Sequence, residues 1–232
     1  MKKTPLVSII VPTLNEEKGI LFFLKQLQFF RAQCEIILVD GGSADNTCDL
    51  AKEYVDILIH ELPGRAIQMN AGAKQASAET LLFLHADSFL PRDALKYIYR
   101  GQKQGYQWGR FDIRLLSTKW LLSLVSWFIN QRSALTGIAT GDQAIFVDKT
   151  LFERVGGYQA IPLMEDIALS IRLKKVAKPY RIQSKVATSA RRWIDVGIVK
   201  TVLLMWWLRL LFFVGVTPEK LAVLYREGRF WK

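Results

Sequence analysis

The chain has 232 residues, of which 50% are hydrophobic and 23% are charged, with 15 Gly and 7 Pro. These values exclude collagen-like, low-complexity and disulfide-stapled chains, and the length is enough to bury a core. The two cysteines, Cys34 and Cys48, have no metal-ligand spacing and suit a reducing compartment, so we expect a cytoplasmic protein. The first apolar stretch is broken by Pro12 and is too short for a signal peptide.

The net charge of +11 lies almost entirely in the second half of the chain. Residues 1–100 contain 11 Lys or Arg and 12 Asp or Glu, whereas residues 101–232 contain 21 and 9. A solvated basic face, a nucleic-acid surface and a membrane surface would each explain this excess. The basic residues are scattered among apolar ones without a nucleic-acid-binding motif, so we expect no nucleic-acid partner.

Strands and helices alternate through the first half. Compact β-branched or apolar runs predict strands, and apolar residues at helical spacing predict the helices between them. Repeated strand–helix–strand units of this length imply a parallel sheet with right-handed crossovers. The predicted strands are 6–11, 35–40, 57–59 and 80–84. The predicted helices are one with its cap and acidic first turn at 15–17 that runs to 30, one at about 44–54, and one that follows residue 64 and runs through 71–76.

Polar or acidic residues follow three of these strands, at 13–16, 40–43 and 85–87. In such sheets ligands bind beyond the carboxyl ends of the strands. Neither a dinucleotide-binding glycine motif nor a P-loop is present. Asp87 could hold a hard divalent cation that bridges pyrophosphate oxygens, and Asp40 could accept hydrogen bonds from a base or ribose.

The second half contains an acidic pair and two long apolar stretches. Glu165 and Asp166 precede an amphipathic segment, 167–176, where simple helix capping is the alternative to a catalytic role. The stretches 120–129 and 200–216 carry Trp and Phe, and the second is interrupted by Arg209, so neither is expected to span a membrane. They could lie in a membrane interface, pack together, or form a dimer contact.

Eight short motifs follow one another along the chain: 8–16 (SIIVPTLNE), 39–45 (VDGGSAD), 64–66 (GRA), 70–72 (NAG), 84–87 (LHAD), 141–144 (GDQA), 164–169 (MEDIAL) and 191–193 (RRW). Their order resembles the family-2 inverting glycosyltransferases of the GT-A fold. A narrower resemblance, to the small subgroup associated with arsenosugar biosynthesis, comes from residues 108–112 (WGRFD), 136–143 (TGIATGDQ) and 162–166 (PLMED).

The resemblance implies an α/β fold with a Rossmann-like, mixed and mostly parallel sheet flanked by helices, followed by C-terminal amphipathic helices. It implies one domain, with a nucleotide-binding half (1–100), an acceptor and catalytic half (101–195) and apolar, basic C-terminal helices (196–232). The implied reaction moves a sugar from a nucleotide sugar, UDP-linked by expectation, to a hydroxyl acceptor with the help of Mg²⁺ or Mn²⁺.

The resemblance also implies roles for individual residues. Asp166 would be the catalytic base and Asp87 the metal-binding acid of the D-x-D motif, although His85 replaces the first acid of that motif. Ser189 replaces the Gln of the Q-x-x-R-W motif, which argues against a processive synthase. Donor or acceptor contacts would come from Gly141, Asp142, Gln143, Glu165, Arg192 and Trp193. Nucleotide contacts would come from Pro12, Leu14, Glu16, Asp40, Gly41, Gly42, Ser43, Arg65, His85 and Ala86.

Other readings of the same fold stay open. A polyprenyl-phosphate glycosyltransferase would use the apolar stretches to reach a lipid-linked acceptor at the membrane surface. A non-catalytic nucleotide- or membrane-binding protein would keep the fold without turnover. The sequence does not choose between a monomer and a homodimer.

Overall fold

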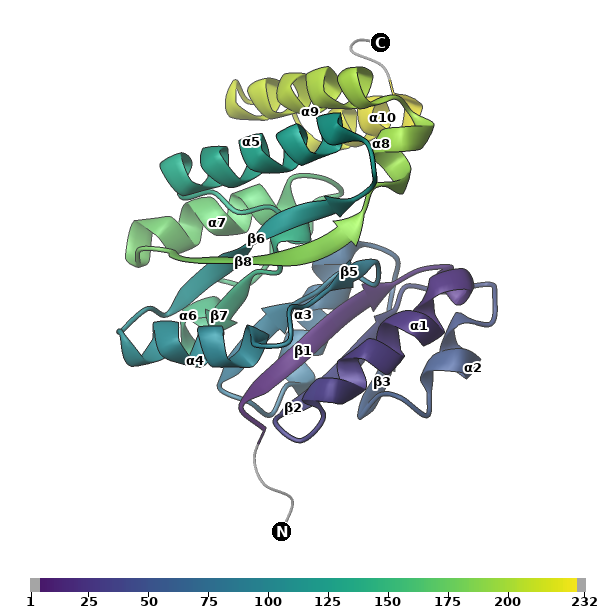
Figure 1. Cartoon of the computed structure of the whole chain (residues 1–232), viewed down its shortest axis with the longest axis vertical. Helices are drawn as coiled ribbons and strands as arrows, with labels where there is room; N and C mark the ends of the chain where they lie inside the picture. The colour runs from purple at the N-terminus through teal and green to yellow at the C-terminus, as the bar shows by residue number, and fades with distance from the viewer. Residues whose placement is uncertain (1–4, 229–232) are drawn as a thin grey trace.

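The structure, a computed structural model, describes residues 5–228 apart from the side chain of Arg192 (Figure 1). The strands are β1 Val7–Thr13, β2 Cys34–Asp40, β3 Ile57–His60, β4 Thr80–Phe83, β5 Ser88–Phe89, β6 Trp108–Leu116, β7 Phe146–Asp148 and β8 Tyr180–Ser189. The α-helices are α1 Glu17–Leu27, α2 Thr47–Ala51, α3 Arg65–Gln75, α4 Ala94–Lys103, α5 Trp120–Thr136, α6 Lys149–Arg154, α7 Glu165–Val176, α8 Arg191–Asp195, α9 Ile198–Phe213 and α10 Pro218–Glu227, with 3-10 turns η1 Gln28–Phe30 and η2 Gly141–Gln143.

All eight strands form one sheet in the order β3-β2-β1-β4-β7-β6-β8-β5. The pairs β1–β2, β1–β4, β2–β3 and β6–β8 are parallel, whereas β7 is antiparallel to both neighbours and β5 is antiparallel to β8. The predicted mixed, mostly parallel sheet is confirmed. Because strands from both halves of the chain share it, the two halves form one continuous layer.

Strand β1 is longer than predicted, because it continues through Pro12 to Thr13. The Ile10 carbonyl faces β4 and accepts from the Leu84 N–H at 3.0 Å. The backbone of Pro12, two residues later, faces the same side, but the pairing of β1 with β4 ends at Ile10. No partner strand there needs the N–H that proline lacks, so the strand runs on.

Helix α2 is shorter than the predicted 44–54. The Asp45 carboxylate accepts from the backbone N–H of Thr47 at 3.0 Å and from its hydroxyl at 2.5 Å. It also accepts from the N–H of Glu17, the first residue of α1, at 3.2 Å. These bonds hold residues 44–46 as a loop, and the helix begins only at Thr47.

The sheet is buried on both faces, as the apolar runs predicted. Ile9 packs against the layer of α1 and α4, and Ile10 packs against the layer of α3, α6 and α7. Helices α9 and α10 form a further layer, in which Leu208 and Leu221 pack against Ile167 of α7. None of the helices in the described part of the chain is both long and apolar enough to cross a membrane.

One edge of β6 is covered by side chains rather than by a strand. The Asn130 side chain accepts from the Ile113 N–H at 2.8 Å and donates to the Ile113 carbonyl at 3.0 Å. Two residues further along β6, the Leu115 N–H donates to the Ser126 hydroxyl at 3.0 Å. The Gln143 amide donates to the Phe111 carbonyl at 3.4 Å. Helix α5 therefore turns its polar residues inward to complete the hydrogen bonding of β6.

Candidate functional site

The carboxyl end of β2 holds a buried carboxylate. Asp40 accepts from the N–H groups of Gly42 and Ser43, both at 2.9 Å, and from the Ser43 hydroxyl at 2.5 Å. Burial raises the pKa of Asp40, but these hydrogen bonds, with one from Cys48, outweigh it and the net pKa is lowered. Asp40 is thus held as a charged acceptor at the edge where the sequence placed a ligand.

The loops after β1 and β2 are bonded to each other. Asn15, with φ of 54°, donates its N–H to the Ser43 hydroxyl at 2.8 Å and accepts from the Ala44 N–H at 2.9 Å. The Gln68 amide of α3 donates to the carbonyls of Thr13 and Val39, both at 2.8 Å. These bonds fix the two strand ends relative to each other, so the loops form one preorganised edge.

Four of the residues predicted to contact the nucleotide lie at this edge, two of them buried and two exposed to solvent. Pro12 and Gly41 are buried and shape the edge, whereas Leu14 and Gly42 are exposed on it. A Cβ on Gly41 would lie 3.0 Å from the Gln68 amide nitrogen, so a side chain there would press on the Gln68 bridge.

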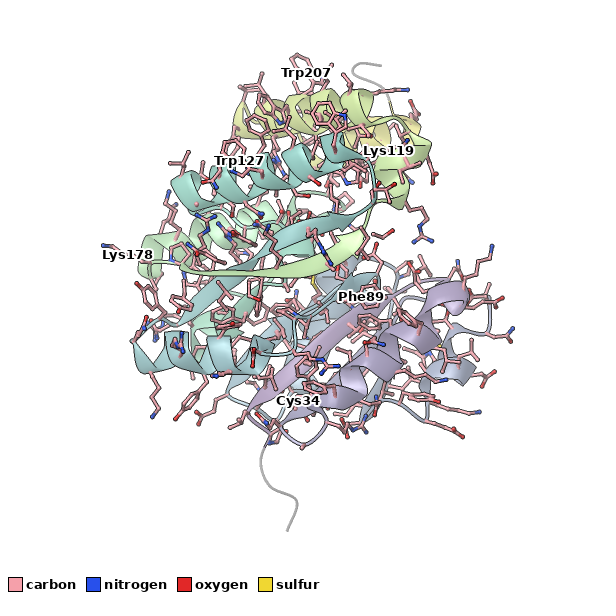
Figure 2. The ribbon with its side chains drawn as sticks, viewed as in Figure 1. Cys34, Phe89, Lys119, Trp127, Lys178 and Trp207 are labelled. Atoms are coloured by element: carbon pink, nitrogen blue, oxygen red, sulfur yellow. The ribbon has the colours of Figure 1, made fainter. Side chains whose placement is uncertain are left out.

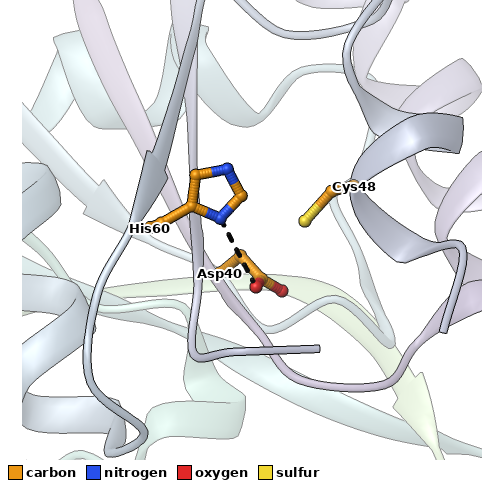
Figure 3. A group of neighbouring side chains, drawn as sticks. All are labelled: Asp40, Cys48 and His60. Carbon is orange, nitrogen blue, oxygen red and sulfur yellow. Dashed lines mark ion pairs between the residues drawn. The ribbon is translucent and has the colours of Figure 1, made fainter. Parts of the chain in front are cut away.

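Asp40, Cys48 and His60 gather at this edge (Figure 3). Their potential ligand atoms all lie within 4.8 Å of one another, and His60 Nδ1 is 3.8 Å from an Asp40 oxygen. A thiol, an imidazole and one carboxylate are a set that suits Zn²⁺ better than Mg²⁺ or Mn²⁺. The three side chains therefore suit the predicted Mg²⁺ or Mn²⁺ poorly, and the site predicted for that cation remains Asp87.

A second polar centre forms where η2 meets the start of α7. The Gly141 N–H donates to the Asp166 carboxylate at 2.8 Å, and the other carboxylate oxygen accepts from the Ile167 N–H at 2.7 Å. A Cβ on Gly141 would lie 2.7 Å from Nε2 of His85. The absence of a side chain at residue 141 thus lets the loop after β4 approach the acidic pair.

The acidic pair lies in the first turn of α7, where the helix dipole favours carboxylates and the Ile167 N–H donates to Asp166. Met164, with φ of 69°, occupies the N-cap of α7 without a side-chain hydrogen bond. Burial and the neighbouring Asp166 raise the pKa of Glu165 to about 7, against the opposing effect of Arg65. Burial also raises the pKa of Asp166, moderated by its two backbone hydrogen bonds. Two adjacent carboxyl groups that hold protons unusually well are typical of an acid–base site.

Arg65, the first residue of α3, is the cation of this centre. Loss of water would lower the pKa of its guanidinium, but Glu165, Tyr225, Asp166 and Asp87 together outweigh that effect and the pKa is raised. Burial and the charge of Arg65 lower the pKa of His85 to about 3, so its imidazole is neutral. The predicted residues Arg65, His85, Asp87, Gly141, Glu165 and Asp166 are thus brought together.

Glu16 connects the two polar regions. Burial raises the pKa of its carboxyl group, Arg191 lowers it, and Asp87 and Asp45 raise it further. An Arg191 nitrogen lies 3.8 Å from a Glu16 oxygen. The loop after β1 therefore faces both Asp87 and α8.

Arg132 is a site residue that the sequence reasoning missed. It lies on α5, with Asp142 and Asp166 as its charged neighbours. Its Nε and Nη2 atoms and one Asp142 oxygen are buried without a hydrogen-bond partner in the described structure. Burial raises the pKa of Asp142 despite a hydrogen bond from Thr140. In the sequence Arg132 only follows the apolar stretch 120–129, a pattern that indicates the basic margin of a helix and not a site residue.

Some predicted residues do not face this centre. Gln143 is fully buried and accepts from the Thr140 N–H at 3.1 Å, so it shapes the turn and completes the edge of β6 rather than reaching a sugar. Trp193 packs in an apolar cluster with Leu115 and Leu122. Ala86 is buried. Arg192 lies in α8, and its side chain is outside the described residues.

Comparison with solved structures gives the fold. A mannosyltransferase from Pyrobaculum calidifontis, solved with GDP-Man and Mn²⁺, matches with a TM-score of 0.63 at 21% identity, over 80% of this chain and 57% of that chain. TarS residues 1–349 from S. aureus, solved with UDP-GlcNAc, match with a TM-score of 0.62 at 18% identity, over 79% and 58%. The sheet and its helices have the GT-A glycosyltransferase architecture.

Sequence comparison gives the family. The probable glycosyltransferase YdaM of Bacillus subtilis is 29% identical over 203 residues, which cover 75% of this chain and 47% of that protein. Poly-beta-1,6-N-acetyl-D-glucosamine synthase of Staphylococcus aureus is 27% identical over 170 residues, covering 64% and 40%. This chain therefore spans less than half the length of these curated relatives. The family model described as glycosyl transferase family 2 matches residues 8–124, and the chain belongs to this family.

Proposed function

We propose that this protein transfers a sugar from a nucleotide-sugar donor to a hydroxyl group of an acceptor, with inversion at the anomeric carbon. The observation that carries the proposal is the acidic pair Glu165–Asp166, with raised pKa values, beside Arg65 and Asp87 at the ligand-binding edge of the sheet. The mannosyltransferase and TarS structures of this fold contain GDP-Man and UDP-GlcNAc, which supports a nucleotide-sugar donor.

The nucleoside would bind at the β1–β2 edge. Asp40 is charged and fixed by Ser43 and Gly42, so its remaining lone pairs can accept from a base N–H or a ribose hydroxyl. The exposed Leu14 and Gly42 beside it leave room for a planar base. A UDP-linked donor is our specific proposal.

The diphosphate would lie between Arg65 and a divalent cation at Asp87. Hard cations of this kind bind through one or two carboxylates and complete their coordination with phosphate oxygens and water. The half-exposed Asp87, with Glu16 as its acidic neighbour and the neutral His85 two residues earlier, fits this pattern. When bound, Mg²⁺ or Mn²⁺ would neutralise charge on the leaving nucleoside diphosphate.

Asp166 would act as the general base. Its carboxylate takes the acceptor hydroxyl proton as that oxygen forms a bond to the anomeric carbon, and the bond from that carbon to the β-phosphate oxygen breaks. A raised pKa makes Asp166 a stronger base than an ordinary aspartate. The Gly141 N–H holds its orientation. Arg65 stabilises the departing negative charge.

Two acceptor classes follow from different observations. The motifs shared with the arsenosugar-associated subgroup support a small soluble acceptor, and the free thiols of Cys34 and Cys48 support a cytoplasmic site of action. The exposed tryptophans of α5 and α9 support a lipid-linked acceptor such as a polyprenyl phosphate. We propose the soluble acceptor first.

The test is nucleotide release from a panel of UDP- and GDP-sugars with Mn²⁺ or Mg²⁺, in parallel with thermal stability. We expect one donor to stabilise the protein and to release its nucleoside diphosphate when an acceptor is added. Stabilisation without release from any soluble or lipid acceptor would indicate a non-catalytic nucleotide-binding protein. No stabilisation by any nucleoside diphosphate would overturn the proposal.

A further inference from the structure

Helices α5 and α9 lie side by side at the end of the molecule farthest from Cys34 (Figure 2). They contact each other through Ile198 and Val202 of α9, which pack on the cluster of Leu122 and Val125 of α5. Trp127 and Trp207 lie on this outer layer (Figure 2). We define the outer face as the exposed large apolar residues of these two helices and the turn after them: Trp120, Leu124, Trp127, Phe128, Leu135, Val199, Leu203, Trp206, Trp207, Leu210, Phe213 and Val214.

The polarity of α5 is inverted relative to that of an ordinary surface helix. Its buried side carries Ser126, Asn130 and Ser133, whose polar atoms hydrogen-bond main-chain groups, while its outer side carries tryptophan, phenylalanine and leucine. A water-facing helix has the opposite arrangement. Exposed apolar patches of this size mark surfaces that meet a protein or a membrane.

The charges around the outer face favour an anionic partner over a second copy of this chain. Residues 113–141 and 196–218, which contain both helices, hold no Asp or Glu, although Asp195 and Glu219 directly adjoin the second segment. Of their five Lys or Arg, Arg132 belongs to the polar centre and does not contribute to the outer face. Lys119 at the start of α5 and Lys200 in α9 are exposed beside the apolar residues. A symmetric contact between α5 and α9 of two copies would bring these cations together, and neither helix carries a carboxylate to pair with them. Anionic headgroups pair with them directly.

We propose that the outer face of α5 and α9 docks on an anionic lipid bilayer, with both helices parallel to its surface. The helices have 17 and 16 residues, fewer than the roughly 20 needed to span a bilayer. Their tryptophans sit at the level of the headgroups and their leucines and phenylalanines reach the acyl boundary, with Lys119 and Lys200 at the margin. This docking stands apart from the transfer reaction, since it uses none of the residues of the polar centre.

The test measures binding to vesicles of phosphatidylcholine alone and of phosphatidylcholine with 30% phosphatidylglycerol. The test variant is Trp127→Ala with Trp206→Ala, which removes side chains that are 53% and 65% exposed. The matched control is Phe29→Ala in η1, which is 62% exposed but lies outside the outer face. We expect the wild type and the control to bind anionic vesicles, and the double variant to bind at least roughly tenfold more weakly.

Charge reversal by Lys119→Glu with Lys200→Glu gives a second measurement. We expect it to weaken binding to the anionic vesicles and to remove the salt dependence of that binding. Quenching of wild-type tryptophan fluorescence by brominated lipid reports insertion without any variant, and nucleotide binding by each variant confirms that the rest of the protein is intact.

Three outcomes overturn the docking proposal. One is a wild type that binds no anionic vesicles at low salt. A second is equal binding by the double variant and the wild type. A third is a stable dimer in sedimentation velocity that the double variant converts to monomers, without vesicle binding, because the outer face would then be a contact between copies. Equal binding to neutral vesicles would overturn its anionic part.

Discussion

The carboxylate of Asp166 accepts a hydrogen bond of 2.8 Å from the backbone N–H of Gly141, 25 residues earlier in the chain. This bond joins the start of α7 to η2 and holds the acidic pair where the loop after β4 can reach it. A carboxylate fixed by a backbone donor keeps one orientation, which a general base requires.

Replacing this base should separate binding from turnover. We expect Asp166→Asn to lower kcat by about 10²–10⁴-fold, because the amide accepts no proton, while nucleotide affinity stays within about twofold. Single-turnover nucleotide release and calorimetric nucleotide binding measure the two effects. Glu153→Gln, an exposed residue of α6, is the control. Retained turnover in Asp166→Asn would contradict the assignment.

The pH profile should report the coupled acidic pair. The active form needs an ionised Asp166, whose pKa is raised by burial, so kcat/KM should rise with pH as the pair ionises, with its upper step at about 7, where the pKa of Glu165 lies. Glu165→Gln removes the group that ionises at about 7, so the upper step should disappear and the rise should follow Asp166 alone. A profile that is unchanged in Glu165→Gln would show that the pair does not control the rate.

The ionisation of Glu165 should also affect the stability of the fold, which should fall as pH rises. The folded protein keeps a proton on Glu165 between its ordinary pKa of 4.5 and about 7, whereas the unfolded chain does not. The free energy of unfolding should therefore fall as pH rises through this window, by about 1.4 kcal/mol for each unit of pKa shift. Urea unfolding at pH 5 and pH 8 measures this, and Glu165→Gln should reduce the difference.

A side chain at residue 141 should disturb the polar centre. The added methyl of Gly141→Ala would meet His85 Nε2 at 2.7 Å, and we expect a loss of about 1–3 kcal/mol in stability together with a fall in kcat. Gly19→Ala in α1 is the matched control, because nothing lies within 4 Å of its new methyl. That variant should gain about 0.5 kcal/mol. Equal effects in the two variants would argue against a close approach at Gly141.

Local patterns in the sequence predict much of this fold. The runs around Ile9, Ile36 and Leu81 predict strands buried on both faces, and polar residues after them predict the ligand edge. The local pattern does not predict the short loop at 44–46, because this loop depends in part on the bond from the N–H of Glu17, at the start of α1, to Asp45. Contacts of this range leave no local periodicity.

The same limit explains the residues missed at the site. Arg132 looked like the end of an apolar helix, and only the packing of α5 on the sheet brings it near Asp142 and Asp166. Gln143 belonged to a motif that pointed to sugar contact, yet the open edge of β6 gives its amide a structural partner. A motif predicts which residues matter, whereas the long-range fold decides which of them face the ligand.

Metal binding should distinguish Asp87 from the cluster at Asp40. We expect Mn²⁺ with UDP to raise the Tm of the wild type and of Cys48→Ser, whose hydroxyl still donates to Asp40. Asp87→Ala should lose this stabilisation, which reaches about 2.7 kcal/mol at a ligand concentration of 100 times Kd. The reverse result, with Mn²⁺ stabilisation lost in Cys48→Ser and kept in Asp87→Ala, would place the metal at Asp40, Cys48 and His60.

The polar inner side of α5 should be essential for stability. Asn130 bonds both the N–H and the C=O of Ile113, so Asn130→Ala leaves two buried main-chain groups unpaired. We expect a loss of about 2–5 kcal/mol in the free energy of unfolding, measured in urea. Ser123→Ala, on the exposed side of the same helix, should change it by no more than about 0.5 kcal/mol. If the two substitutions cost the same, Asn130 does not complete the edge of β6, and the inverted polarity of α5 would need another explanation.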